Sequence, residues 1–497
     1  MHVSNKRNYR SRVLVWCAGL VVLCAQASSF FACSFGTSAS LPVLTPPPST
    51  PPAPSITISV TPTTIVLGQS AVLSWSSIGI GGACTASGAW SGPQNPAGST
   101  KVTPATSGTF AYVLTCAVAP AGSIAQSATL TVNAMAALNR AHAVAANPRA
   151  RLVRTDLVAD VPGTRAANTD PHLIEPWGLV LPDGLPAVLA SRGSNRSTSY
   201  DGAGSSQPGA VPLRAQLPAS ARGSPFGATG IVANSSGEFV VSADGRSAAA
   251  RLIFAGTGGM IAGWAPEVDL TNAVIAYAAV DGAAYTSLAL AISSSPGESH
   301  LYATDFRNGK VDVFDGTFER QTRAPTRFAF TDPALPSGYS PFGIAAIGDL
   351  IYIAYAQRLG SSGTDPLSGP GLGLVNVFTL SGDFITRLIT SGGTLNAPWA
   401  MVRAPVDGGA PFAGALLVGD SGDGRINAFD SVTGSLLGSL SDEKGVALVV
   451  PGLHGLAFGN DAALQPRTAL FFAAGAHEGA QGWYGRIDFA PAPQSAP

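Results

Sequence analysis

Hydrophobic and polar residues alternate with a period of two along much of this chain, and this alternation predicts short β-strands. In the first region with the pattern, apolar residues recur at every second position in four runs, 56–60, 71–75, 111–116 and 128–132. Turn residues, mainly Gly and Ser, separate the runs. We therefore predict a small β-sandwich over residues 55–134.

A repeat fills the second region with this alternation. Six times between Glu175 and Phe489, a short opening leads into an apolar strand, and a later strand ends on an aromatic residue and a turn. The clearest openings are Pro-Phe-Gly at 341–343 and Pro-Trp-Ala at 398–400. Successive units begin about 50 to 60 residues apart, near the period of propeller blades. The predicted starting points are Pro176, Pro225, Leu288, Pro341, Pro398 and His454.

Each unit has room for four strands, and four-stranded sheets in a ring make a β-propeller. In the third unit we predict strands at 287–291, 300–304, 311–314 and 326–330. The run 151–158 is predicted to add an outer strand beside 485–489, because the last sheet would otherwise keep an unpaired edge.

The opening tripeptide has a physical explanation. Pro enters from an extended residue, the aromatic side chain is predicted to fill the wedge between neighbouring sheets, and Gly lets the inner strands approach closely. These aromatic residues, which we predict to be structural, are Trp177, Phe226, Phe342 and Trp399.

The N-terminal segment predicts export. A basic start precedes the apolar run 13–27, which is typical of a signal within residues 1–33. Two processing sites compete: a small-x-small pattern at 25–27, and a lipobox in which Cys33 is lipidated. We favour lipidation, because the Pro-, Ser- and Thr-rich tether 34–54 follows Cys33 directly. The remaining segments are a linker at 135–150 and a disordered tail at 491–497.

Composition narrows the classes of function. With Lys+Arg 28 against Asp+Glu 29, the chain has no basic excess to neutralise phosphates, so we expect no nucleic-acid partner. Only 11% of residues are charged, which suits an exported β protein. Cys84 and Cys116 are the two cysteines beyond the signal region, and we predict that they form a disulfide.

Several strings resemble known families. Residues 83–92 resemble bacterial Ig-like repeats, which usually act as spacers. The strings 169–178, 301–315 and 416–430 resemble an uncharacterised bacterial family of NHL-like propeller proteins, some of which carry a PEP-CTERM sorting tail. This resemblance implies the fold and an envelope location, but no catalysis. The chain departs from the family in lacking the sorting tail and in placing His454 where an aromatic residue is usual.

The expected fold class is therefore all-β: a six-bladed β-propeller over 151–490, preceded by a small Ig-like β-sandwich. Ligands of propellers usually lie at the axial mouth, near the loops that precede the innermost strands. The predicted ligand-binding residues, which stand at or just before these strands, are Glu175, Tyr339, Asn396 and His454.

A metal site is a second expectation. Carboxylates at the mouth would hold a divalent cation such as calcium, and the run 420–424 resembles half of a calcium loop. Glu175-Pro176-Trp177 also resembles lactonase-type propellers, whose axial metal is held by a Glu, an Asn and an Asp. The predicted metal ligands are Glu175, Asp305, Asp420 and Asp423.

These observations lead to two hypotheses of function. The leading one is a noncatalytic, exported protein of the periplasm, outer membrane or cell surface of a bacterium. Its propeller, on an Ig-like stalk, would bind a protein, glycan or small ligand or would serve as a scaffold. The protein would contact the membrane only through a lipid on Cys33. The alternative is a metal-dependent hydrolase or lactonase with an axial active site.

Overall fold

The computed structural model describes residues 53–66, 70–80, 82–104, 108–118, 122–133, 151–207, 214–218, 225–293, 297–322, 327–360, 365–406, 412–442, 444–475 and 481–490. These residues form strands, turns and loops and no helix, so within them there is no helix that could span a membrane. The predicted export signal, tether, linker and tail lie outside the described residues, apart from positions 53 and 54.

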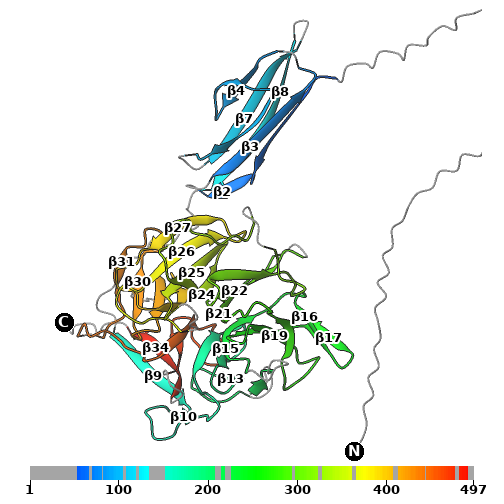
Figure 1. Cartoon of the computed structure of the whole chain (residues 1–497). Coiled ribbons are helices and arrows are strands. Elements are labelled where there is room, and N and C mark those ends of the chain that lie inside the picture. The colour runs from blue at the N-terminus through cyan, green and yellow to red at the C-terminus, as the bar shows by residue number, and fades with distance from the viewer. Residues whose placement is uncertain are drawn as a thin grey trace, which may run out of the picture. The chain divides into compact units, whose positions relative to one another are not determined.

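The strands between Ser55 and Asn133 form two sheets (Figure 1). One sheet has the order β1 (Ser55–Thr61), β3 (Ala71–Ile78) and β6 (Ala97–Val102). The other has the order β2 (Thr64–Val66), β8 (Gly122–Asn133), β7 (Gly108–Val118), β4 (Cys84–Gly88) and β5 (Gly92–Gln94). Along β1 and β3 every second side chain is turned inward, as the alternation predicts.

The predicted disulfide between Cys84 and Cys116 is confirmed. The two residues are direct cross-strand partners on β4 and β7, so the bridge lies within one sheet. In antibody domains the disulfide joins the two sheets instead. Trp75 and Trp90 pack in the core with their rings 4.9 Å apart, and both indole N–H groups donate to backbone carbonyls.

The described strands from Arg151 to Ala490 form six open sheets and one separate hairpin (Figure 1). Sheet 1 contains β11 (Pro176–Val180), β12 (Ala187–Ser191), β13 (Arg196–Tyr200) and β14 (Arg214–Gln216); sheet 2 contains β15 (Ala228–Ala233), β18 (Leu252–Gly256), β19 (Met260–Trp264) and β20 (Val274–Ala278); sheet 3 contains β21 (Tyr285–Ala291), β22 (His300–Asp305) and β23 (Lys310–Phe314). The hairpin between β15 and β18 consists of β16 (Val240–Ala243) and β17 (Arg246–Ala249).

The other three sheets follow the same order along the chain. Sheet 4 contains β24 (Tyr339–Ile347), β25 (Leu350–Gln357), β26 (Gly373–Thr379) and β27 (Phe384–Ile389); sheet 5 contains β28 (Pro398–Arg403), β29 (Leu416–Asp420), β30 (Ile426–Phe429) and β31 (Leu436–Ser439); sheet 6 contains β32 (Leu453–Phe458), β33 (Leu470–Gly475), β34 (Gly482–Ala490), β9 (Arg151–Ala159) and β10 (Asn168–Thr169).

The first strand of each unit is the one that meets the neighbouring sheets, and we call these six the inner strands: β11, β15, β21, β24, β28 and β32. Each inner strand packs against the next one in this order, and β32 packs against β11. The contacts therefore run around a ring and return to their start. The architecture is all-β and propeller-like.

Sheet 6 combines the two ends of this region. β34 pairs antiparallel with β9, from Trp483 opposite Ala159 to Ala490 opposite Arg151. In Figure 1, β9 lies directly beside the red β34. The predicted pairing of the upstream strand with the last strand is confirmed, and it holds the first and last strands of the region in one sheet.

Sheet 3 corrects one prediction, because it has three strands instead of four. The expected strand at 326–330 is wrong: Phe328 and Phe330 have positive φ angles of 55° and 44°, which a strand does not accommodate. Their N–H groups donate to the carbonyl oxygens of Ser381 and Gly382, in the turn after β26 of sheet 4. This segment therefore joins the neighbouring sheet's turn and does not extend sheet 3.

Candidate functional site

Each inner strand contains one residue that is left out of the pairing with the second strand of its sheet. The register shifts across this residue in all six sheets, which marks a β-bulge. A bulge bends a strand and redirects a side chain. We call these six equivalent residues the bulge ring: Trp177, Thr229, Thr286, Phe342, Trp399 and His454.

Side chains of the bulge ring meet one another from different sheets. Trp177 of sheet 1 stacks on His454 of sheet 6, with ring centroids 3.9 Å apart. The same indole lies 6.0 Å from the Phe342 ring of sheet 4 and 6.2 Å from the Trp399 ring of sheet 5. Because residues on non-adjacent sheets touch, they lie on the axis of the ring. All of them are buried, so the axis is filled at this level.

Hydrogen bonds complete the bulge ring. The Thr229 hydroxyl donates to the carbonyl oxygen of Tyr285 on β21 at 2.8 Å, and the Thr286 hydroxyl donates to that of Phe342 on β24 at 2.8 Å. The indole N–H of Trp399 donates to the carbonyl oxygen of Thr286 at 3.0 Å. These buried donors are satisfied by the backbone of another sheet, which stabilises the ring.

The position of the aromatic side chains differs from the prediction. Trp177, Phe342 and Trp399 pack at the axis and not in the wedges between neighbouring sheets. Phe226 does pack between sheets 1 and 2, but it precedes the bulge residue Thr229 by three positions. The predicted starts of the second and third units, Pro225 and Leu288, are therefore displaced from the bulges of β15 and β21. In these two strands the bulge residue is Thr and not an aromatic residue.

The residue after each bulge is small: Gly178, Gly230, Ser287, Gly343, Ala400 and Gly455. A Cβ atom on Gly343 would lie 1.9 Å from the carbonyl oxygen of Trp399 on the next inner strand. On Gly455 it would lie 2.8 Å from the carbonyl oxygen of Trp177. The predicted reason for Gly, close approach of inner strands, is confirmed at these positions.

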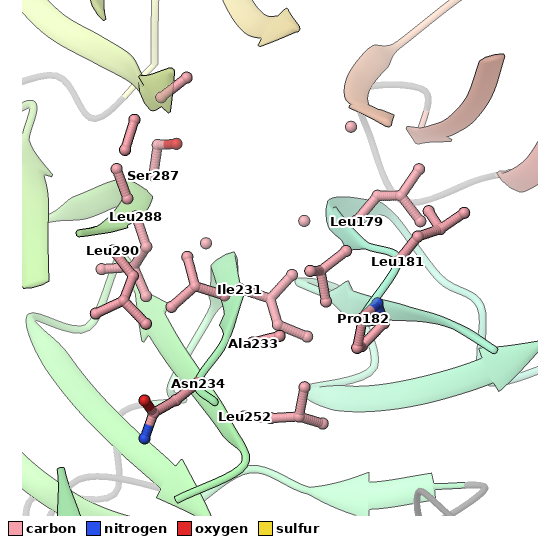
Figure 2. Close-up of a pocket in the computed structure, with 18 of the residues that line it drawn as sticks. Leu179, Leu181, Pro182, Ile231, Ala233, Asn234, Leu252, Ser287, Leu288 and Leu290 are labelled. Atoms are coloured by element: carbon pink, nitrogen blue, oxygen red, sulfur yellow. The ribbon is translucent and has the colours of Figure 1, made fainter. Parts of the chain in front are cut away.

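Two positions beyond the bulge, every inner strand has a large aliphatic residue. These side chains belong to the hydrophobic clusters between neighbouring sheets, and they also line a cavity. The cavity has a volume of about 530 Å³, and we call it the axial cavity (Figure 2). We call the six residues the aliphatic ring: Leu179, Ile231, Leu288, Ile344, Met401 and Leu456.

Further along the strands, Leu181, Ala233, Leu290 and Ala346 extend the cavity wall. In Figure 2, Leu179, Ile231 and Leu288 come from three strands and surround a common space. Two ionisable side chains are among the described residues of the lining, Asp183 and Arg251. Arg251 forms an ion pair with Glu267. The aliphatic ring thus gives this cavity a partly apolar wall, and polar atoms line the rest of it.

Glu175 lies on the other side of the bulge ring, two residues before Trp177. Its carboxylate accepts a hydrogen bond from Arg192 at 2.9 Å, and the same guanidinium lies 5.3 Å from the Trp177 ring. Its φ angle of 53° and the bond from the Arg192 N–H to its carbonyl oxygen fix the backbone there. Glu175 is thus held by an ion pair beside the bulge ring.

The other three predicted ligand residues have separate surroundings. Asn396 accepts a hydrogen bond from the Gly369 N–H at 2.7 Å, which orders a loop. His454 belongs to the bulge ring, and its Nδ1 lies 2.9 Å from the Gly452 carbonyl oxygen. Tyr339 begins β24 and packs against the cluster between sheets 3 and 4. Of the four, Glu175 and His454 share a neighbourhood, through Trp177.

The structure does not bring the four predicted metal ligands together. Asp305 ends β22 and Asp420 ends β29, in different sheets, and each receives a side-chain hydrogen bond, from Asn308 and Asn427 respectively. Burial raises the pKa of both carboxyls. The pKa of Asp420 lies well above the usual value for an aspartate. Asp423 accepts a hydrogen bond from a backbone N–H in its own turn. In the part of the chain that the structure describes, no three His, Cys, Asp or Glu side chains form a group suited to a metal ion.

Sequence reasoning missed Thr229, Thr286 and the aliphatic ring. A sequence pattern marks these positions: an aromatic residue, Thr or His, then a small residue, then a large aliphatic residue. The six strings with this order are Trp-Gly-Leu, Thr-Gly-Ile, Thr-Ser-Leu, Phe-Gly-Ile, Trp-Ala-Met and His-Gly-Leu, which begin at the bulge positions.

The sequence matches no protein-family model. It is similar to two uncharacterised proteins of Acanthamoeba polyphaga mimivirus. Protein R648 is 32% identical over 291 residues, which cover 58% of this chain and 70% of the relative. Protein L690 is 33% identical over 289 residues, which cover 58% of this chain and 74% of the relative. The chain belongs to the family of these mimivirus proteins. The predicted membership of a bacterial NHL-like family is therefore wrong.

Solved structures that resemble the chain include virginiamycin B lyase from Staphylococcus aureus, with 15% identity, 68% of this chain and 99% of that chain covered, and a TM-score of 0.36. A glucose dehydrogenase has 12% identity, 64% and 98% coverage, and a TM-score of 0.36. At these TM-scores the likeness carries no conclusion about the activity of this chain.

Proposed function

We propose that this protein is an exported, noncatalytic binding or scaffold protein, in which an Ig-like sandwich carries a six-bladed β-propeller. The propeller would extend over residues 151–490 with the six sheets as its blades, and the sandwich over 55–134. The supporting observation for the blades is the closed order of the inner strands, together with a bulge at the equivalent place in each.

The bulge ring carries the noncatalytic part of the proposal. At the level of the bulge ring, packed rings and satisfied hydroxyl groups fill the axis. Glu175, two residues before the bulge residue Trp177, is engaged by Arg192. Beyond the bulge ring, the axial cavity offers aliphatic side chains. Binding needs only such a surface, whereas hydrolysis needs positioned polar groups.

Export to the periplasm or cell surface rests on two features of the sequence and one of the structure. The first 33 residues have the basic start and apolar run of an export signal, and Cys33 lies in a lipobox-like context ahead of the tether 34–54. The disulfide between Cys84 and Cys116 suits an oxidising compartment. The segments 135–150 and 491–497 would serve as linker and tail.

Activity assays on the full chain test the noncatalytic proposal. Purified protein is incubated with a panel of esters and lactones, with calcium and with a chelator, and the same preparation is tested for thermal stabilisation by glycans, peptides and apolar small molecules. We expect no turnover, and stabilisation by one ligand class, since a ligand at 100 times its Kd adds about 2.7 kcal/mol. Turnover that is lost with the chelator and in Glu175→Gln would establish the hydrolase instead.

Fractionation of cells that express the full chain tests export. We expect the wild type in the membrane fraction with surface or periplasmic exposure, and Cys33→Ser in the soluble exported fraction. Ala32→Gly is the matched control, because it keeps the lipidated cysteine and should leave the protein in the membrane. Retention of the wild type in the cytosol would refute export, and membrane retention of Cys33→Ser would refute the lipid anchor alone.

A further inference from the structure

The axial cavity has one closed end and walls from all six sheets. At its inner end the bulge ring fills the axis, and Trp399 belongs both to that ring and to the cavity lining. The aliphatic ring contributes one side chain from each inner strand. These side chains are almost fully buried, with 7% of Ile231 and 8% of Met401 exposed. The space is therefore a half-open recess that the bulge ring closes at one end, and its lining combines the aliphatic ring with polar atoms.

Water gains little along the aliphatic part of this lining. A water molecule needs two to four polar partners, and the aliphatic ring provides none. The volume of about 530 Å³ here lies within the range of roughly 300 to 1,000 Å³ for small-molecule sites.

The charged side chains of the cavity lining favour an uncharged ligand. Arg251 is the cation of the lining, and it already pairs with Glu267, so it offers little to an anion. Asp183 adds a negative charge and would oppose an anionic headgroup. Asn234 and Ser235 can donate to or accept from a neutral polar group on the ligand.

We propose that the axial cavity binds one compact, uncharged apolar small molecule, such as a fused-ring or short-chain hydrophobic compound. The inference rests on the proposed binding function and names its ligand class. Burial of the ligand against the aliphatic ring would supply the affinity, because about 25 cal/mol is gained for each Å² of apolar surface removed from water.

The neutral dye phenylnaphthylamine, which fluoresces in apolar surroundings, is the probe. It is titrated into the full chain, and the anionic dye anilinonaphthalene sulfonate is titrated in parallel. We expect about one neutral dye per chain and weaker binding of the anionic dye. The variant Ala233→Trp places an indole in the cavity and should weaken neutral-dye binding by at least about tenfold. Ala278→Trp, on the exposed edge strand β20, should retain wild-type affinity.

Three results would overturn the proposal: no binding of the neutral dye to wild type, equal loss in Ala233→Trp and Ala278→Trp, or no loss in either. Should Ala233→Trp fail to fold, Ala346→Trp fills the same cavity from sheet 4. A measurement on wild type is independent of both variants: the dye must raise the unfolding temperature, since it binds only the folded state. Absence of dye binding without hydrolysis would refute this inference alone, whereas hydrolysis would refute the proposed function whatever the dye does.

Discussion

The bulge ring and the aliphatic ring occupy equivalent places two residues apart on the same six strands, yet one is filled and the other is hollow. In the bulge ring, three large aromatic side chains and His454 reach across the axis, and two Thr hydroxyls bind the backbone. In the aliphatic ring, side chains of Leu, Ile and Met size border a cavity of about 530 Å³, together with residues further along the strands. The difference shows that the bulge, which redirects one side chain on each inner strand, and the size of that side chain decide where this axis is closed.

The largest effect is expected in the bulge ring. Trp177→Ala removes the indole that contacts Phe342, Trp399 and His454, and it leaves a hole at the axis. We expect the free energy of unfolding to fall by about 3 to 5 kcal/mol, measured by urea denaturation. A loss below about 1 kcal/mol would mean that the axis is not packed at this level.

A second test concerns the spacing of the inner strands. In Gly343→Ala, the new methyl would lie 1.9 Å from the Trp399 carbonyl oxygen, so the two strands must move apart. We expect a loss of about 1 to 3 kcal/mol in the free energy of unfolding. Gly237→Ala is the matched control, because its methyl would meet no atom within 4 Å, and it should be close to neutral. Equal effects of the two changes would contradict the close approach of β24 and β28.

The aliphatic ring should be more tolerant. Ile344→Ala is expected to cost about 1 to 2 kcal/mol in the free energy of unfolding, because part of this side chain already faces the cavity and loses fewer packing contacts. Ile353→Ala removes the same side chain from the fully buried β25, and it should cost about 2 to 5 kcal/mol. If Ile344→Ala costs as much as Ile353→Ala, the cavity does not exist in solution.

The smallest expected effect is the pH dependence of stability that Asp420 causes. Asp420 lies opposite Pro398, the residue before the bulge in β28. Burial raises the pKa of Asp420, with opposition from the Asn396 N–H. A carboxyl whose pKa is higher in the folded state stabilises the fold at low pH, and this contribution is lost as pH rises through the folded-state pKa. The stability of Asp420→Asn relative to wild type should therefore increase as pH rises above about 4, measured by urea denaturation at each pH.

Asp332 provides the opposite sign as a control. Burial raises its pKa, but hydrogen bonds from Arg387 and other donors lower it below the usual value. Its contribution to stability is thus present above the unfolded-state pKa and is lost as pH falls through the folded-state pKa. The destabilisation caused by Asp332→Asn should shrink at acid pH. Parallel pH profiles for Asp420→Asn and Asp332→Asn would contradict the different surroundings of the two carboxyls.

Local patterns were enough to predict many of the strands, the spacing of the repeat and the disulfide, but not the segment 326–330. Alternation marks the strands because each has one inward face, and the run 151–158 could be placed beside 485–489 because the last sheet needs an edge partner. The bulge at Thr229 was missed because Pro225-Phe226-Gly227 matches the aromatic opening three residues earlier. A bulge is defined by pairing with a distant strand, which no local pattern contains.

The candidate site was harder to predict, since it depends on which side chains meet across the ring. Glu175 was expected to face a metal. Instead its carboxylate forms an ion pair with Arg192, which directly follows β12. Asp305 and Asp420 were predicted to be metal ligands at the axial mouth, but each is buried at the end of a different strand. The sequence does not distinguish the aliphatic ring from core residues, because Leu and Ile at alternate positions of a strand usually belong to the core.

Xenon binding in crystals of the full chain tests the central claim most directly, because xenon enters apolar cavities and its anomalous signal locates it. The account predicts one xenon site between the side chains of Leu179, Leu288 and Met401 in the axial cavity, and none among Trp177, Phe342 and Trp399. Xenon within the bulge ring, or a cavity filled by side chains, would contradict it.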